Sequence, residues 1–215
     1  MAFQANNVGA PLRCTKYEVS GVVNTRYVKP LSVDEYLAFE EQSESRHECV
    51  GGHLLELPGS NERRSLIKNA VCDVLRAHLR GSACRVYSTA MKVRVGDIFY
   101  YPDVVVSDVP FSPDAVYLTA PLLIVEVACE SSESRDMLEK RVAYQALPSL
   151  REYVVLFDRE KRVVVFRRVP DGWEQETCLA RDVCGMTSIG LVVPIEELYR
   201  DVPDVAKAPD DLEPR

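Results

Sequence analysis

Apolar residues along this 215-residue chain recur with the period of helices in some segments and of strands in others. Ser32 and Glu35 have the spacing of a capping box, which marks the start of a helix. A longer helical pattern begins near residue 62, and Gly81 is placed to end it. The predicted helices span residues 32–41, 62–80, about 133–146, and the short segment PIEELY that begins at Pro194.

Runs rich in β-branched and aromatic residues predict strands between these helices. In one of them apolar residues alternate with Lys92 and Arg94, so one face of that strand is apolar and the other is basic. The predicted strands are His53–Leu57, Cys84–Tyr87, Met91–Val95, Ile98–Val106, residues 122–128, Glu152–Asp158, Arg162–Arg168 and Trp173–Leu179. The last three form a hairpin region near the C-terminus, and the whole pattern predicts one α/β domain, α+β-like in its order.

The two ends of the chain differ from its middle. Residues 1–29 have mixed composition without a clear period and are interpreted as an N-terminal extension of uncertain order. Residues 203–215 are interpreted as a disordered acidic tail. The length suits a single domain over residues 30–202 that buries a substantial core.

Composition indicates a cytoplasmic protein that does not enter the membrane. No apolar run approaches the roughly 18 residues of a membrane helix, and the N-terminus lacks the pattern of a secretory signal. Seven cysteines without a CxxC pair suit reduced thiols in a cytosol. With only three histidines, a zinc cluster is disfavoured.

The net charge of −7 argues against a generic nucleic-acid binder, for which a basic balance is usual. The segment 201–215 carries five acids against two bases, so removing its −3 leaves −4 for the remainder. Any contact with a polyanion must therefore come from a local patch. The candidate patches are Arg63, Arg64 and Lys68, or Lys92 and Arg94.

Two acids interrupt apolar strand patterns: Asp103 in YYPDVVV and Glu126 in LLIVEVA. An ionised carboxylate inside such a strand costs several kcal/mol unless a cation or donors meet it. Two of them on neighbouring strands would repel by about 4 kcal/mol at 4 Å, and a divalent metal would offset that repulsion. Asp103 alone could equally be a turn residue after Pro102, whereas no turn signal lies near Glu126. Together they favour a functional pair.

The segment SSESRDMLEKRVAYQAL (131–147) places Asp136, Lys140 and Tyr144 on one helix face. The simplest interpretation is an exposed Asp136–Lys140 pair worth about 0.3–0.5 kcal/mol. The alternative directs Lys140 at the cleft of Glu126. On this segment alone, the exposed pair is favoured.

Glu48 ends the first helical region just before the turn at Gly51 and Gly52, where a solvated helix residue is a simpler interpretation than a ligand. His47 and His53 flank it without the HExxH spacing of a zinc protease. No GxSxG, GxxxxGK or GxGxxG motif occurs. A cysteine nucleophile stays open, although none of the seven cysteines has a convincing local signature.

The succession of several segments resembles the Uma-type (Uma-two) family of bacterial restriction-endonuclease-like proteins, within the PD-(D/E)XK nuclease-like superfamily. The segments are RHECVGGHLLEL, CRVYSTAMKVRV, YYPDVVVS, PLLIVEVACESSESRDMLEKRVAYQALPSLREYVVL and RVVVFRRVPDGW. The resemblance covers about residues 31–202. It implies a restriction-endonuclease-like core, with a mixed β-sheet flanked by helices, and Mg²⁺-dependent hydrolysis of phosphodiester bonds.

By this resemblance Asp103 matches the acid of the PD motif and Glu126 the acid of the (D/E)XK strand. Ala128 stands where the superfamily expects lysine, and Lys140 matches a lysine displaced onto the following helix. Glu48 matches a recurring glutamate that could be a third acid. Asp136 and Tyr144 also match recurring family residues. Departures occur at Arg64, where a histidine is usual, at Ala90, where an aspartate is usual, and at residues 129–131, which replace a common Ser-Pro-Ser.

The first functional hypothesis is therefore a metal-dependent endonuclease acting on nucleic acid, with DNA favoured. Its catalytic residues are Asp103, Glu126, Lys140 and Glu48; its ligands for Mg²⁺ or Mn²⁺ are Asp103, Glu126 and Glu48; its substrate-binding candidates are Lys92, Arg94, Arg64 and Tyr144. The resemblance also implies a homodimer. The alternatives are a catalytically inactive module of the same fold that binds nucleic acid or a protein, and hydrolysis of a smaller phosphoester.

Overall fold

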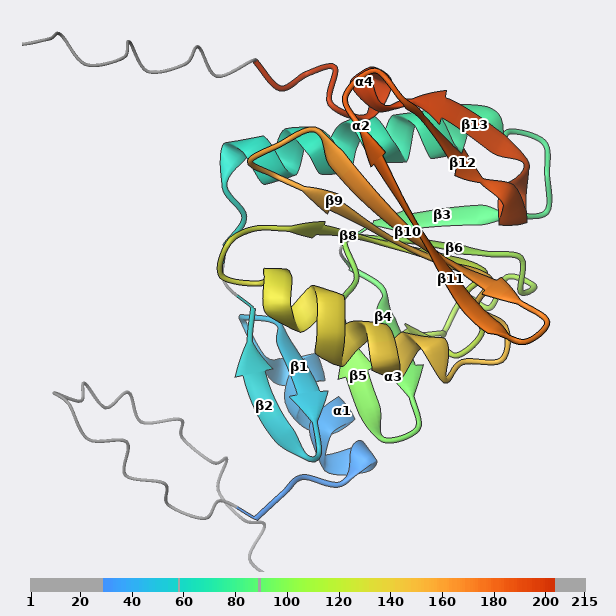
Figure 1. The fold of residues 1–215 in the computed structure, drawn as a ribbon. Coiled ribbons are helices and arrows are strands. Elements are labelled where there is room, and N and C mark those ends of the chain that lie inside the picture. The colour runs from blue at the N-terminus through green and yellow to red at the C-terminus, as the bar shows by residue number, and fades with distance from the viewer. Residues whose placement is uncertain (1–28, 58, 89, 204–215) are drawn as a thin grey trace, which may run out of the picture.

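The computed structural model describes residues 29–57, 59–88 and 90–203 (Figure 1). The predictions for the order of residues 1–28 and 204–215 lie outside the described residues. Two larger β-sheets and one two-stranded sheet make up most of this part of the chain. No helix of the described residues is both long and apolar enough to span a membrane.

The six-stranded sheet at the centre of the molecule is mixed. Its strands are, in sheet order, β11 (Gly172–Leu179), β10 (Arg162–Val169), β9 (Glu152–Phe157), β8 (Leu123–Ala128), β6 (Val104–Ser107) and β3 (Arg85–Ser88). The pair β8 and β9 is parallel, and every other neighbouring pair is antiparallel. The predicted strands of residues 122–128, 152–158, 162–168 and 173–179 are confirmed.

Helices cover both faces of this sheet (Figure 1). On one face lies α2 (Glu62–His78). Asn61 caps its N-terminus, since the Asn61 side chain accepts a hydrogen bond from the backbone N–H of Arg64. On the other lie a π-helix, η1 (Arg135–Lys140), and the short α3 (Arg141–Gln145). Because strand side chains alternate, the sheet separates two hydrophobic cores, one packed on α2 and the other on α3.

A smaller five-stranded sheet lies on the η1 side of the molecule (Figure 1). Its order is β2 (His53–Glu56), β1 (His47–Val50), β5 (Ile98–Tyr100), β4 (Lys92–Val95) and β7 (Tyr117–Leu118). It packs against α1 (Val33–Gln42), which begins with the predicted capping box, both of whose hydrogen bonds form. The C-terminal part adds β12 (Val183–Met186), β13 (Leu191–Pro194), a 3₁₀ turn (Thr187–Ile189) and α4 (Ile195–Leu198) against α2.

The structure corrects two predictions that bear on the site. Residues 98–106 were predicted as one strand, but the chain leaves the five-stranded sheet after β5 and enters the six-stranded sheet at β6. The break falls at Tyr101–Asp103, where Pro102 has no N–H to continue a ladder. Glu48 was assigned to a helix end, and it lies instead on β1, paired with Leu55 of β2. Gly51 and Gly52, with φ of +58° and +78°, close that hairpin.

Two further predictions are wrong or incomplete. The helix expected over about 133–146 is a π-helix followed by a short α-helix. The β12–β13 hairpin was not predicted at all, since its strands are only four residues long and one of them contains Gly185.

Candidate active site

Glu126 points from β8 toward η1, on the same face as Ile124 and Ala128, and is fully buried. Its Oε1 accepts hydrogen bonds from Lys140 Nζ at 2.9 Å and from the Tyr144 hydroxyl at 3.3 Å. Its Oε2 lies 3.4 Å from the backbone N–H of Asp103. The two acids predicted as a pair therefore meet at adjacent strands.

Asp103 is held where the chain enters β6, and only its edge reaches solvent. Its Oδ2 accepts from the backbone N–H of Val127, the residue after Glu126, at 2.8 Å. The same oxygen accepts from Arg64 Nη2, also at 2.8 Å. Arg64 comes from the first turn of α2, so a helix on the opposite face of the sheet supplies the cation for this carboxylate.

Glu48 reaches the same cluster from β1 and is fully buried. Its Oε1 accepts from the backbone N–H of Tyr101 at 3.1 Å and lies 3.4 Å from Lys140 Nζ. Its Oε2 forms an ion pair with Arg135 Nη1 at 2.6 Å. The interpretation of Glu48 as a solvated residue is wrong.

Arg135 and Lys140 are five residues apart, yet both contact Glu48. In an α-helix, residues five apart point about 140° away from each other, because each residue turns the helix by about 100°. The wider π turn brings them onto one face, and such turns occur frequently at functional sites. Both cations also lie near the ring of Tyr100, at 5.6 and 5.8 Å from its centroid.

Asp136 is the fourth acid of the cluster, with 1% of its surface exposed. Its Oδ1 lies 3.3 Å from Lys140 Nζ, but neither carboxylate oxygen has a hydrogen-bond partner. The exposed Asp136–Lys140 pair favoured from the local sequence is therefore wrong, because both side chains are buried.

The cluster contains more acids than bases. The acids are Glu48, Asp103, Glu126 and Asp136, and the bases in contact with them are Arg64, Arg135 and Lys140. Burial, reinforced by the neighbouring acids and opposed by Lys140, raises the pKa of Glu126 to about 8. Burial alone would lower the pKa of Lys140, but the surrounding carboxylates outweigh it and raise that pKa, so Lys140 stays an ammonium.

The other predicted residues lie at different distances from this cluster. Tyr144 is fully buried and contacts Glu126 directly. Lys92 is half-buried, and its Nζ donates to the Tyr101 hydroxyl at 3.2 Å. Arg94 lies farther along β4, where it donates to Gly96 O at 2.7 Å and to the Tyr117 hydroxyl at 3.3 Å.

Arg135 was not identified from the sequence as a site residue. An i, i+5 relation to Lys140 carries no weight unless a π turn is known in advance, and the sequence offers no signal for that turn. The role of the Tyr101 backbone was likewise hidden, because it depends on the break between β5 and β6.

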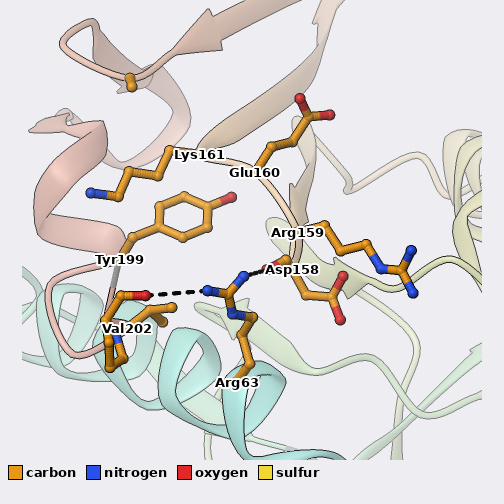
Figure 2. A pocket seen from close by; sticks show the side chains of 9 residues that line it. Arg63, Asp158, Arg159, Glu160, Lys161, Tyr199 and Val202 are labelled. Atoms are coloured by element: carbon orange, nitrogen blue, oxygen red, sulfur yellow. Dashed lines mark hydrogen bonds between the residues drawn. The ribbon is translucent and has the colours of Figure 1, made fainter. Parts of the chain in front are cut away.

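A separate pocket of about 400 Å³ lies beside Arg63, in the first turn of α2 (Figure 2). Its lining includes Arg63, Asp158, Arg159, Glu160, Lys161 and Tyr199. Arg63 donates there to two carbonyl oxygens, those of Asp158 and Pro203, at 3.1 and 3.2 Å. None of the four acids of the cluster lines this pocket, so the two regions are distinct.

Across the described ranges 29–57, 59–88 and 90–203, no three His, Cys, Asp or Glu side chains are grouped as ligands for one metal ion. Cations of the chain itself pair with one oxygen each of Asp103, Glu48 and Glu126.

Two curated proteins of Synechocystis sp. are similar to this chain, and both are described as uncharacterized. Protein slr1290 is 28% identical over 174 residues, which cover 79% of this chain and 92% of that protein. Protein sll1609 is 26% identical over 148 residues, which cover 66% of this chain and 84% of that protein.

The chain also matches a solved structure and a protein family. A crystal structure from Anabaena variabilis, described as a "putative nuclease belonging to DUF820", aligns with a TM-score of 0.68 at 18% identity, over 80% of this chain and 98% of that one. At this identity the alignment shows the fold, and it confirms the predicted restriction-endonuclease-like core. Residues 33–196 match the Uma2 family, described as "Putative restriction endonuclease". The chain therefore belongs to the Uma2 family.

Proposed function

We propose that this protein is a metal-dependent endonuclease that hydrolyses phosphodiester bonds of DNA. One observation carries the proposal: Glu48, Asp103, Glu126 and Lys140 come from four separate segments and meet in one buried cluster, linked by contacts of 3.4 Å or less. Membership of a family described as restriction endonucleases agrees with it.

The donor set fits a magnesium-type ion. Such ions take oxygen ligands and are usually held by one or two carboxylates plus waters, so a ready group of three acids is not required. Acids outnumber bases four to three in the cluster, and both oxygens of Asp136 lack hydrogen bonds. Asp103 and Glu126 would hold Mg²⁺ or Mn²⁺, with Glu48 as the third acid. When bound, the ion lowers the pKa of water and neutralises charge on the phosphate.

The remaining residues hold this arrangement in place. Tyr144 and Lys140 fix Oε1 of Glu126, and the Val127 N–H fixes Oδ2 of Asp103. In the proposed reaction the Lys140 ammonium orients the attacking water or stabilises charge on the phosphate oxygens. Glu48 steadies Lys140 through the contact at 3.4 Å.

Substrate contacts are proposed for two cations near the acids. Arg64 donates from Nη2 to Asp103, and the other N–H groups of its guanidinium are the proposed donors to a phosphate. Lys92 lies on β4, and its Nζ donates to the hydroxyl of Tyr101. Tyr101 is two residues before Asp103 in the sequence. A homodimer in the cytoplasm, with one site for each DNA strand, belongs to the same proposal.

The test compares wild type with Asp103→Asn and Glu126→Gln on a panel of double-stranded DNA, single-stranded DNA and RNA, with Mg²⁺, with Mn²⁺ and with EDTA. We expect cleavage by wild type that needs the metal, and a loss of more than about 10²-fold in each variant, because each removes one metal ligand. Equal cleavage by all three proteins would contradict the proposal. A Glu152→Gln variant controls for general effects of removing a buried acid.

A second candidate is the catalytically inactive module. It is favoured by the contacts of the acids, because Arg64, Arg135 and Lys140 already pair with Asp103, Glu48 and Glu126. Calorimetry separates the two candidates. Tight binding of nucleic acid or protein without any binding of Mg²⁺ or Mn²⁺ would support the module.

A further inference from the structure

Three carboxylates surround the ammonium group of Lys140. Its Nζ lies 2.9 Å from Glu126 Oε1, 3.3 Å from Asp136 Oδ1 and 3.4 Å from Glu48 Oε1. The side chain of Lys140 is almost fully buried, so these oxygens, and not water, supply most of its polar surroundings. A point enclosed by three carboxylate oxygens is a cation position, which the tethered amine fills.

Asp136 gives independent evidence that this position is built for a cation. It is buried, it lies on the π turn that aims it at Nζ, and neither of its oxygens has a hydrogen-bond partner. A buried carboxylate without donors is costly, and one ammonium shared among three acids offsets only part of that cost.

We propose that Lys140 is the resident cation of a second cation position, formed by Glu48, Glu126 and Asp136, and that its ammonium limits the site to one exogenous divalent ion. The second half of this statement rests on the proposed function, in which Asp103 and Glu126 hold that ion. Glu126 and Glu48 are common to both positions, and Glu126 spans them directly, since its Oε1 faces Lys140 and its Oε2 faces Asp103.

The distances allow a divalent ion to replace the amine. Metal–oxygen distances for Mg²⁺ and Ca²⁺ are about 2.0–2.6 Å, so the oxygens now at 2.9–3.4 Å from Nζ would each move inward by roughly 1 Å. While the ammonium stays in place, the three acids are not available as a metal-ligand group, in agreement with the lack of such a group among the described residues.

The experiment removes the amine and counts bound ions. In Lys140→Met a linear apolar side chain of similar length replaces the lysine, and Lys140→Gln keeps one donor for Glu126. Isothermal calorimetry of the metal-free full chain with Mn²⁺ should give one ion for wild type and one additional ion for each variant. Without metal, Lys140→Met should lose about 10 °C in Tm, because three buried acids lose their shared cation, and Mn²⁺ should restore most of that loss.

Two controls assign the additional ion. Lys140→Met combined with Asp136→Asn should bind the additional ion more weakly, with a higher Kd in the same titration, because the cage keeps two of its three carboxylates. Lys92→Met removes another partly buried lysine, one that contacts the Tyr101 hydroxyl and has no carboxylate oxygen of the described residues within 4 Å. This variant should bind the same number of ions as wild type.

The outcomes separate this inference from the proposed function. If wild type binds no Mn²⁺ but Lys140→Met binds one, the ion at Asp103 and Glu126 is contradicted and the second position is supported. If both Lys140 variants bind as many ions as wild type, or neither folds even with Mn²⁺ present, the second position is overturned. Asp103→Asn added to Lys140→Met should remove the first ion and leave the additional one.

Discussion

Glu126 and Glu152 are both fully buried and lie on the parallel neighbours β8 and β9, yet their surroundings differ. Oε1 of Glu152 accepts from Arg167 Nε at 2.9 Å, from the Thr187 N–H at 2.9 Å and from the Thr187 hydroxyl at 3.1 Å. Its Oε2 accepts from the N–H of Ser188 at 2.8 Å and from the hydroxyl of the same residue. Five donors surround this one carboxylate, although Arg167 also pairs with the partly exposed Glu176 at 3.3 Å.

Glu126 accepts from fewer donors than Glu152, and other acids compete with it for the ammonium of Lys140. Lys140 and Tyr144 donate to one of its oxygens, and the other has only the long contact at 3.4 Å. Lys140 is shared with Glu48 and Asp136. The comparison teaches that burial of an acid alone does not indicate function. A buried acid whose donors match its lone pairs stabilises the fold, whereas a surplus of acid over donor indicates a site for another cation.

Replacing each of these two acids by glutamine should change the free energy of unfolding differently, and this is the largest effect that we expect. Glu152→Gln should lower the free energy of unfolding by about 3 kcal/mol, because it removes a buried charge that Arg167 and four other donors require. Glu126→Gln in metal-free protein should not destabilise the fold at pH 8, since it relieves the repulsion among the acids. Urea unfolding of both variants measures the difference.

Opposite results would refute the interpretation of Glu126. A loss for Glu126→Gln as large as the loss for Glu152→Gln would mean that Glu126 is also a structural acid. Arg167→Gln serves as a matched check on the Glu152 side, because it should destabilise the fold by a similar amount if the pair acts as a unit.

The next effect is a dependence of stability on pH. Burial raises the pKa of Glu126 from 4.5 to about 8, so the folded state keeps a proton that the unfolded state releases. Stability therefore falls as pH rises from about 4.5 to 8. Other groups titrate in this range, so the measured quantity is the difference in free energy of unfolding between wild type and Glu126→Gln in EDTA.

As pH rises, the free energy of unfolding of wild type should fall relative to that of Glu126→Gln. A difference independent of pH would mean that Glu126 is ionised throughout in the folded protein. Addition of Mg²⁺ or Mn²⁺ should reduce the pH dependence of wild type, because an ion that binds the carboxylate favours its charged form.

Much of the six-stranded sheet could be predicted, because strands such as β8 and β9 consist of long apolar runs. The adjacency of Asp103 and Glu126 followed from the same pattern, since a polar residue inside such a run requires a partner. The two-sheet arrangement could not be predicted, because the crossover at Pro102 depends on contacts of the five-stranded sheet that lie far apart in sequence.

The contents of the site were predicted less completely than its position. Glu48 and Lys140 were named through the family resemblance, and local pattern alone favoured solvated residues at both positions. Asp136 and Arg135 join the cluster only because η1 is a π-helix. Residue propensities do not distinguish a π turn from an α turn, so the number of acids around Lys140 could not be derived from the sequence.

The smallest effect that we expect is on nucleic-acid binding by two cations of β4. Here too, the expectation depends on how well each charge is matched by its partners. Lys92 contacts the Tyr101 hydroxyl and ring, whereas Arg94 donates to Gly96 O and Tyr117 and lies 3.7 Å from Asp97. If the protein binds nucleic acid, Lys92→Gln should weaken binding about threefold and reduce the salt dependence by about one ion, while Arg94→Gln should change neither. Fluorescence anisotropy with a labelled duplex at several salt concentrations measures both quantities. Equal losses in the two variants would mean that strand position, and not the supply of partners, decides which cation meets the phosphates.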